Sequence, residues 1–202
     1  MTLSISTVSG DYVQGSFGLL PHAGERARAA LYFSRHVSSQ RPDENIELAR
    51  WYLRAALSEF RSLFDLLEAD FKEQGLAALW KQSQQRRCIE SDPLVTILRK
   101  VRDFAIHSSI VKGEPTTFKV VSLTDHDSLE QDIPAIVFET LDRGTLTGQR
   151  GKDELSNFSD EALSIFNEHA RRWPSDLLVQ IVIYRTSEYL ASFLADHTRR
   201  DQ

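Results

Sequence analysis

The sequence DPLVTILRKVRDFAIHSS, residues 92–109, has the pattern of an amphipathic helix around which the rest of the chain is organised. Asp92 or Ser91 is a suitable N-cap, and Pro93 suits a first helical turn, where the backbone N–H that proline lacks would have no partner in any case. Apolar residues recur three and four positions apart at Leu94, Ile97, Leu98, Val101 and Ala105. This spacing predicts a helix with one face in the protein core.

The far end of this predicted helix carries the one tight group of Arg, Asp and His residues in the chain. Arg99, Asp103 and His107 are four positions apart, so they share one face of a helix. On that face Asp103 can accept a proton from the imidazole of His107 and orient it. Arg102 lies one step around the helix from this row.

The longest predicted helix covers residues 44–74, with Asp43 as its cap and Gly75 as its stop. Its apolar residues keep a spacing of three and four throughout, as a central helix requires. They are Ile46, Ala49, Leu53, Ala56, Leu57, Phe60, Leu63, Phe64, Leu67 and Phe71.

Other segments are predicted to pack around these two helices. Residues 1–21 contain breakers without periodicity and read as a loosely packed N-terminal arm, and a first helix is expected at 23–38. A short helix at 76–86 ends in the basic pair Arg86 and Arg87. Two helices are expected within 158–198: the first has Ser159 as its cap and stops before Pro174, and the second follows from residue 175.

Two short segments rich in β-branched and aromatic residues, 117–123 and 135–141, predict a β-hairpin. The acidic residues between them lack the central glycine and the closing glutamate of a calcium loop, so no metal site is predicted. They are Asp125, Asp127, Glu130 and Asp132, with His126 among them.

The fold class that follows is mainly α, an antiparallel helical bundle with a small β-hairpin insertion at 117–141. At 202 residues, we expect one domain (1–202), with an N-terminal arm at 1–21, a helical core at 22–110 and C-terminal helices at 158–198. Cys88 is the one cysteine, so no internal disulfide is possible and a reducing compartment fits. No apolar run is long enough to span a membrane, and we expect a cytoplasmic protein without a membrane partner.

The net charge of −5 and the pI near 5.7 argue against a general nucleic-acid coat protein. Any nucleic-acid contact would therefore come from a local group of basic side chains. A charge of this size says little about an enzyme that handles one phosphodiester.

The segment Arg102-Asp103-Phe104-Ala105-Ile106-His107 resembles the signature of the HEPN superfamily, an Arg, a polar residue and a His near the end of a helix in an all-α bundle. The resemblance covers residues 44–110 and, more loosely, 158–198. The predicted hairpin and the N-terminal arm depart from the minimal bundle of that family.

The resemblance implies a metal-independent endoribonuclease without a cofactor, of a toxin–antitoxin or phage-defence type, which acts as a homodimer on RNA and has an antitoxin as a possible protein partner. His107 would move a proton during attack of a ribose 2′-hydroxyl on the adjacent phosphate. Arg102 would hold the phosphate, and Asp103 would orient His107. Arg99, Arg86 and Arg87 are further candidates for binding substrate phosphates.

Helix geometry adds a constraint to this hypothesis. Five residues at about 100° each separate Arg102 from His107 by about 140° around an ideal helix. The two residues converge on one phosphate only if the helix ends between them or if two copies meet across a two-fold axis.

Two alternatives stay open. The Arg-Asp-His row is also typical of a hydrogen-bonded cap that fixes the following turn, and Arg86 and Arg87 of an ordinary basic helix end. A catalytically silent helical module that binds a protein or nucleotide partner through the same dimer cleft is the alternative function.

Overall fold

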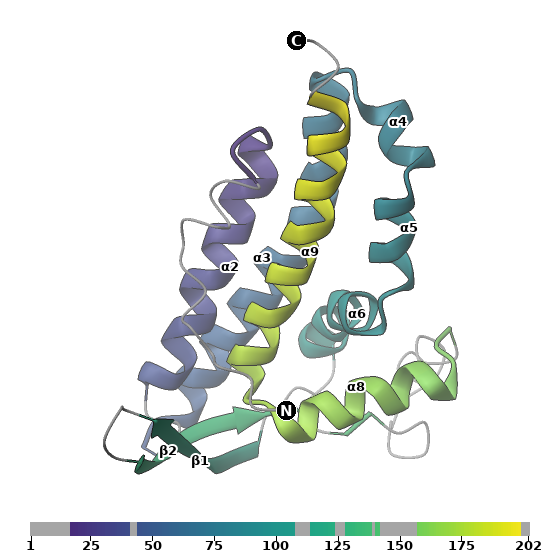
Figure 1. The fold of residues 1–202 in the computed structure, drawn as a ribbon. Coiled ribbons are helices and arrows are strands. Elements are labelled where there is room, and N and C mark those ends of the chain that lie inside the picture. Colours follow the sequence, from purple (N-terminus) through teal and green to yellow (C-terminus); the bar gives the residue numbers. More distant parts are fainter. Residues whose placement is uncertain are drawn as a thin grey trace.

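The computed structural model describes residues 17–40, 44–107, 114–123, 128–138, 140–141 and 157–198. Three long helices, α2 (Pro21–Ser39), α3 (Ile46–Glu73) and α9 (Ser175–Thr198), run side by side (Figure 1). The only sheet in the described part of the chain is a two-stranded hairpin. The fold is therefore mainly α with a small β-hairpin, as the sequence predicts.

The central helix α3 buries the apolar face expected from its spacing, and Leu53, Phe60 and Leu63 are fully buried. Its N-cap is Asn45, whose side chain accepts a hydrogen bond from the N–H of Leu48 at 3.3 Å. The predicted cap, Asp43, lies outside the described residues. The helix ends where expected, because Gly75 has a φ of 72°, a conformation that glycine adopts without a steric cost.

The start of the described chain is more tightly packed than predicted. Phe17 is 1% exposed and Leu20 is fully buried, so the last part of the predicted arm belongs to the core. Helix α2 begins at Pro21, and the buried carboxylate of Asp70 on α3 accepts hydrogen bonds from the N–H groups of His22 (3.3 Å) and Ala23 (2.8 Å). The prediction of a loose arm up to residue 21 is wrong for residues 17–21.

The single helix predicted at 76–86 is instead two helices, α4 (Ala77–Gln82) and α5 (Gln84–Ser91). They are separated at Ser83, whose backbone is extended. The hydroxyl of Ser83 accepts a hydrogen bond from the N–H of Arg86 at 3.1 Å and so caps α5. A serine inside a helical pattern competes for backbone hydrogen bonds in this way. Arg86 therefore lies in the first turn of α5, at an N-terminal helix end, rather than at the C-terminal end of the predicted helix.

The hairpin strands are β1 (Glu114–Leu123) and β2 (Ser128–Val137), paired antiparallel from Glu114 opposite Val137 to Leu123 opposite Ser128. The predicted second strand, 135–141, is therefore shifted toward the C-terminus by several residues. Glu130 and Asp132 belong to β2 instead of a loop, and Pro134 lies opposite Thr117. Both strands of a two-stranded sheet have a free edge, which tolerates a proline that a central strand would exclude.

The base of the hairpin is anchored to the helices. Buried Ile136 and Phe138 join the core, and the ring of Phe138 lies 6.0 Å from that of Phe166 on α8 (Asp160–Arg172). The Asn167 amide on α8 donates to the carbonyl of Leu141 (2.9 Å) and accepts from its N–H (2.8 Å). As predicted, Ser159 caps α8, and its hydroxyl accepts from the N–H of Ala162.

None of the described helices is both long enough and apolar enough to cross a membrane.

Candidate functional site

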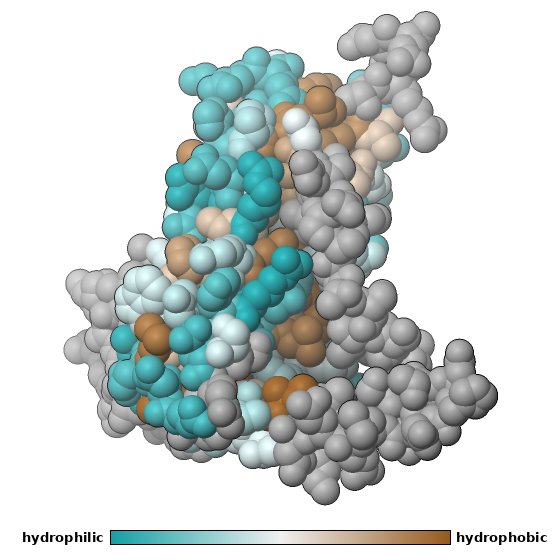
Figure 2. Space-filling view, turned by 90° about the vertical axis from the view of Figure 1, so that its left-hand side faces the viewer, coloured by the Kyte–Doolittle hydropathy of each residue, from teal (hydrophilic) through white to brown (hydrophobic). Residues whose placement is uncertain are grey.

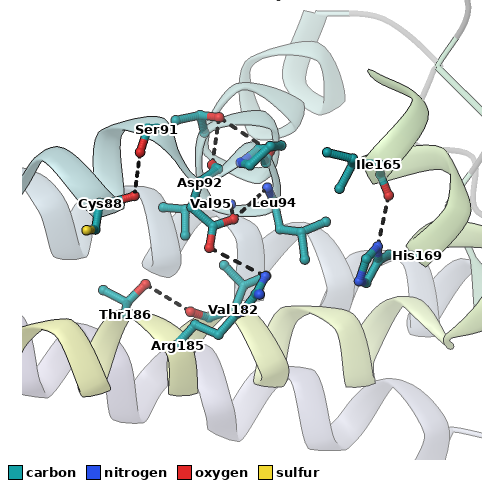
Figure 3. Close-up of polar contacts among 12 residues, drawn as sticks. Cys88, Ser91, Asp92, Leu94, Val95, Ile165, His169, Val182, Arg185 and Thr186 are labelled. Carbon is teal, nitrogen blue, oxygen red and sulfur yellow. Dashed lines mark hydrogen bonds and ion pairs between the residues drawn. The ribbon is translucent and has the colours of Figure 1, made fainter. Parts of the chain in front are cut away.

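The predicted motif helix is α6 (Pro93–His107), and its start is firmly held. Oδ1 of Asp92 accepts hydrogen bonds from the N–H groups of Leu94 at 2.9 Å and Val95 at 3.4 Å (Figure 3). The residue is only 8% exposed. Asp92 is therefore the N-cap that the sequence predicts.

A second contact ties this cap to the last long helix. Oδ2 of Asp92 lies 3.4 Å from a guanidinium nitrogen of Arg185 on α9 (Figure 3). Burial and the negative charge of Asp92 raise the pKa of the nearby Tyr189 hydroxyl. This contact cannot be predicted from the sequence, since 93 positions separate the two partners. The available signal is that Arg185 is the one Lys or Arg residue in α9.

The apolar stripe of α6 faces the core as predicted. Leu94, Val95, Ile97, Leu98 and Val101 are each at most 2% exposed. The helix contacts α3 on one side and α8 on another (Figure 1). Capping and packing together fix the axis of α6 and hence the direction in which its C-terminal end points.

Arg102, Asp103 and His107 lie on the last two turns of α6, while their side chains fall outside the described part of the chain. The backbone is one continuous helix through His107. Since the helix does not end between Arg102 and His107, the separation of about 140° around its axis holds. Of the two ways in which these residues could converge, the structure does not show a helix end between them, and the approach of a second copy stays a prediction.

Arg99 lies one turn before Asp103 on the same face of α6, and its side chain is described. Its guanidinium carbon lies 4.2 Å from the centroid of the Phe64 ring on α3, a cation–π contact. Burial, and secondarily the positive charge of Arg61, lower the pKa of Arg99. Within the described part of the chain no carboxylate forms an ion pair with Arg99, although the negative charges of Asp65, Glu90 and Glu68 act on its pKa in the opposite direction.

The other two candidate phosphate-binding residues are differently placed. Arg86 is already neutralised, because its guanidinium lies 2.7 Å from Glu90 and 3.6 Å from Glu68. Arg87 is exposed and makes long hydrogen bonds of 3.4 Å to the backbone carbonyls of Ser83 and Gln82. Neither side chain is directed to the motif end of α6 by these contacts.

One group of side chains in the described part of the chain has the residue types and spacing to hold a metal ion. His22, Asp70 and Glu73 each offer a ligand atom, and these atoms lie within 4.8 Å of one another. The two Asp70 oxygens already accept the backbone N–H groups of α2, and His22 lies 3.8 Å from Glu73. These contacts explain the burial of Asp70 without a metal. Of the acidic loop considered in the sequence, Asp125, His126 and Asp127 lie outside the described residues.

Comparisons of the chain with models of protein families, with curated proteins and with solved structures found no match.

Proposed function

We propose that this chain is a metal-independent endoribonuclease of a toxin–antitoxin or phage-defence type, which acts as a homodimer. The observation that carries the proposal is α6, a capped and packed helix that runs without a break to His107. Arg102, Asp103 and His107 occupy its last two turns, in the order that resembles the HEPN signature. The residues that would perform the chemistry therefore lie at the end of a rigid element.

In the proposed reaction, the ribose 2′-oxygen attacks the adjacent phosphorus and the bond to the 5′-oxygen of the next nucleotide breaks. His107 moves the proton, either from the 2′-hydroxyl or to the leaving oxygen, because an imidazole has both protonation states accessible near neutrality. Arg102 binds the phosphate and stabilises its developing charge through a planar fork of donors. Asp103 orients His107.

The helix geometry supports a dimer. Arg102 and His107 of one copy are about 140° apart on a continuous helix, so they do not meet at one phosphate within a protomer. In an isologous contact between two α6 ends, Arg102 of one copy approaches His107 of the other. Arg99, on the face shared with Asp103, adds a cation to such a site, stacked on the ring of Phe64.

The first test incubates RNA with the full chain in excess chelator, beside His107→Ala and Arg102→Ala. We expect cleavage that leaves a 2′,3′-cyclic phosphate and falls by about 10²–10⁴-fold in His107→Ala. His169→Ala is the matched control, since His169 also lies in the last turn of a helix, where its Nδ1 donates to the carbonyl of Ile165 at 2.9 Å (Figure 3). Cleavage that is absent from the native chain, or equal in all variants, contradicts the proposal.

The second test asks whether the site is shared between copies. Inactive Arg102→Ala and His107→Ala chains are mixed, unfolded and refolded together. Half of the dimers then contain one copy of each, and one of their two Arg–His pairs is intact, so we expect about a quarter of the native activity. A mixture as inactive as its parts, or a native chain that is monomeric by light scattering at micromolar concentration, rules out the shared site.

The second candidate is a catalytically silent helical module that binds a protein or nucleotide partner through the same cleft. The neutralisation of Arg86 by Glu68 and Glu90 favours it, because a substrate phosphate would have to displace these carboxylates. A native chain that dimerises but leaves every RNA intact would favour this candidate.

A further inference from the structure

Five aromatic rings form one continuous cluster at the surface of the α2–α3 pair, away from α6. The cluster, called here the aromatic patch, consists of Tyr32, Phe33 and His36 on α2 and Trp51 and Tyr52 on α3. His36 lies between two tyrosines, with centroid distances of 4.2 Å to Tyr32 and 5.3 Å to Tyr52. Trp51 continues the cluster at 5.1 Å from Tyr52 and 6.2 Å from Phe33.

Two of these rings are open to solvent although they are large. Tyr32 is 56% exposed and Trp51 is 55% exposed, whereas the neighbouring core positions Ala30, Leu31 and Leu53 are buried. The interior between α2 and α3 is thus filled without Tyr32 and Trp51. The Nδ1 of His36 donates to the carbonyl of Tyr32 at 2.7 Å, which fixes the central ring. The exposed faces are therefore arranged before any ligand binds, which lowers the entropic cost of binding.

Arginines flank the patch on both helices. Arg35 is three positions after Tyr32 and Arg54 three positions after Trp51, so each lies beside an exposed ring on its helix. Arg50 is paired with Glu47 at 2.8 Å, while Arg54 is exposed and has no ion pair within the described part of the chain. On the side of the molecule where α2 lies, hydrophobic residues are interspersed with hydrophilic ones instead of forming one continuous apolar surface (Figure 2). The patch thus joins aromatic faces to local positive charge in a protein of net charge −5.

We propose that the aromatic patch binds unpaired nucleotides of single-stranded RNA, whose bases stack on Tyr32 and Trp51 while Arg54 contacts a phosphate. Stacked aromatic side chains beside basic ones are the usual means of holding single strands, since every base has a π-face. An isologous contact with a second copy is less favourable here, because it would bring the positive charges of two identical patches into one interface. The inference rests on the proposed function, which makes RNA the substrate, and restricts that substrate to regions without base pairs.

The test measures binding separately from cleavage. Full-length His107→Ala is titrated against a fluorescent single-stranded RNA of about 12 nucleotides, long enough for one binding site, and against a duplex of the same sequence. We expect preference for the single strand and quenching of tryptophan fluorescence. Adding Trp51→Ala or Tyr32→Ala weakens binding at least about 10-fold, while Trp51→Phe and Tyr32→Phe keep most of it. The matched control is Leu79→Ala, another large hydrophobic residue that is 44% exposed, which leaves affinity unchanged.

Each outcome is informative. Equal binding of strand and duplex overturns the inference, as does an alanine variant of the patch that behaves like Leu79→Ala. RNA binding that is lost in those variants, in a chain whose native form cleaves nothing, supports the patch while the proposed ribonuclease activity fails. If the native chain cleaves RNA and the patch variants change neither binding nor rate, the ribonuclease proposal is supported and the inference about the patch fails. These rings would then have a partner other than RNA.

Discussion

Replacement of Asp92 tests whether the start of α6 is held as the structure indicates. The two oxygens of this carboxylate have separate tasks: Oδ1 caps the helix through Leu94 and Val95, and Oδ2 pairs with Arg185. Asp92→Asn keeps an excellent cap but removes the charge, whereas Asp92→Ala removes both. The pair of variants therefore separates the two contributions.

The magnitudes follow from burial. Loss of an N-cap costs about 1 kcal/mol of unfolding free energy. Breaking a fully buried ion pair costs about 3–5 kcal/mol, but the side chain of Arg185 is 43% exposed and regains water, so the surface-pair value of about 0.5–1 kcal/mol applies. We expect Asp92→Ala to lose about 2 kcal/mol, which corresponds to a fall of roughly 4–8 °C in Tm for a chain of this size. Asp92→Asn should lose about 0.5–1 kcal/mol.

The measurement is equilibrium unfolding in urea followed by circular dichroism, in which the midpoint should shift at constant slope. Arg185→Ala completes a double-mutant cycle and should add little on top of Asp92→Ala, because the pair is already broken. If Asp92→Asn is as costly as Asp92→Ala, the cap contributes nothing to stability. Additive losses in the cycle would refute the ion pair.

Two further predictions concern single positions. Burial, and secondarily Asp92, raise the pKa of Tyr189 above its usual value near 10, so the unfolded chain ionises first and the stability from this hydroxyl is lost as the pH rises above 10. Between pH 9 and 11, the unfolding free energy of Tyr189→Phe should therefore fall less than that of the native chain. An identical fall would contradict the pKa shift. Gly75→Ala should lower the free energy of unfolding in urea by about 1 kcal/mol because φ is 72°, and backbone strain is the sole cost since no neighbouring atom lies within 4 Å of the added Cβ. Gly75→Asn should lower it less. Equal stability of all three chains would mean that the turn changes conformation to avoid the strain.

The sequence predicts the helices well where the signal is local. Asp92 with Pro93, Ser159 before α8 and Gly75 after α3 each act within one turn of the chain, so neighbouring residues suffice to identify them. The errors arise where a residue has competing uses. Ser83 reads as one more polar position in a helix until its extended backbone divides α4 from α5.

The position of β2 and the N-terminal boundary of the core depend on partners far away in the chain. Residues 128–134 contain Glu130, Asp132 and Pro134, which disfavour a strand, yet pairing with β1 overrides that preference. Phe17 and Leu20 are buried only because other helices cover them. The spacing of apolar residues within a segment as short as 17–20 cannot reveal such burial.

For the candidate site, the sequence places Arg102, Asp103 and His107 on the correct element and predicts its cap. It does not predict that Arg99 stacks on Phe64, that Arg86 pairs with Glu68, or that Arg185 reaches Asp92, since all three contacts join different helices. Whether the motif end meets a second copy stays a prediction.

The buried carboxylate of Asp70 fixes the position of α2 along α3. Together with the ion pair of Arg26 and Glu59 at 2.9 Å, it joins the first two turns of α2 to the middle and the last turn of α3. Sliding one helix along the other by one turn, about 5.4 Å, would break both contacts, so α2 and α3 are held as one rigid unit. The rings of the aromatic patch come from both helices, and the contacts of Asp70 and Arg26 keep the spacing between these rings constant while the molecule fluctuates.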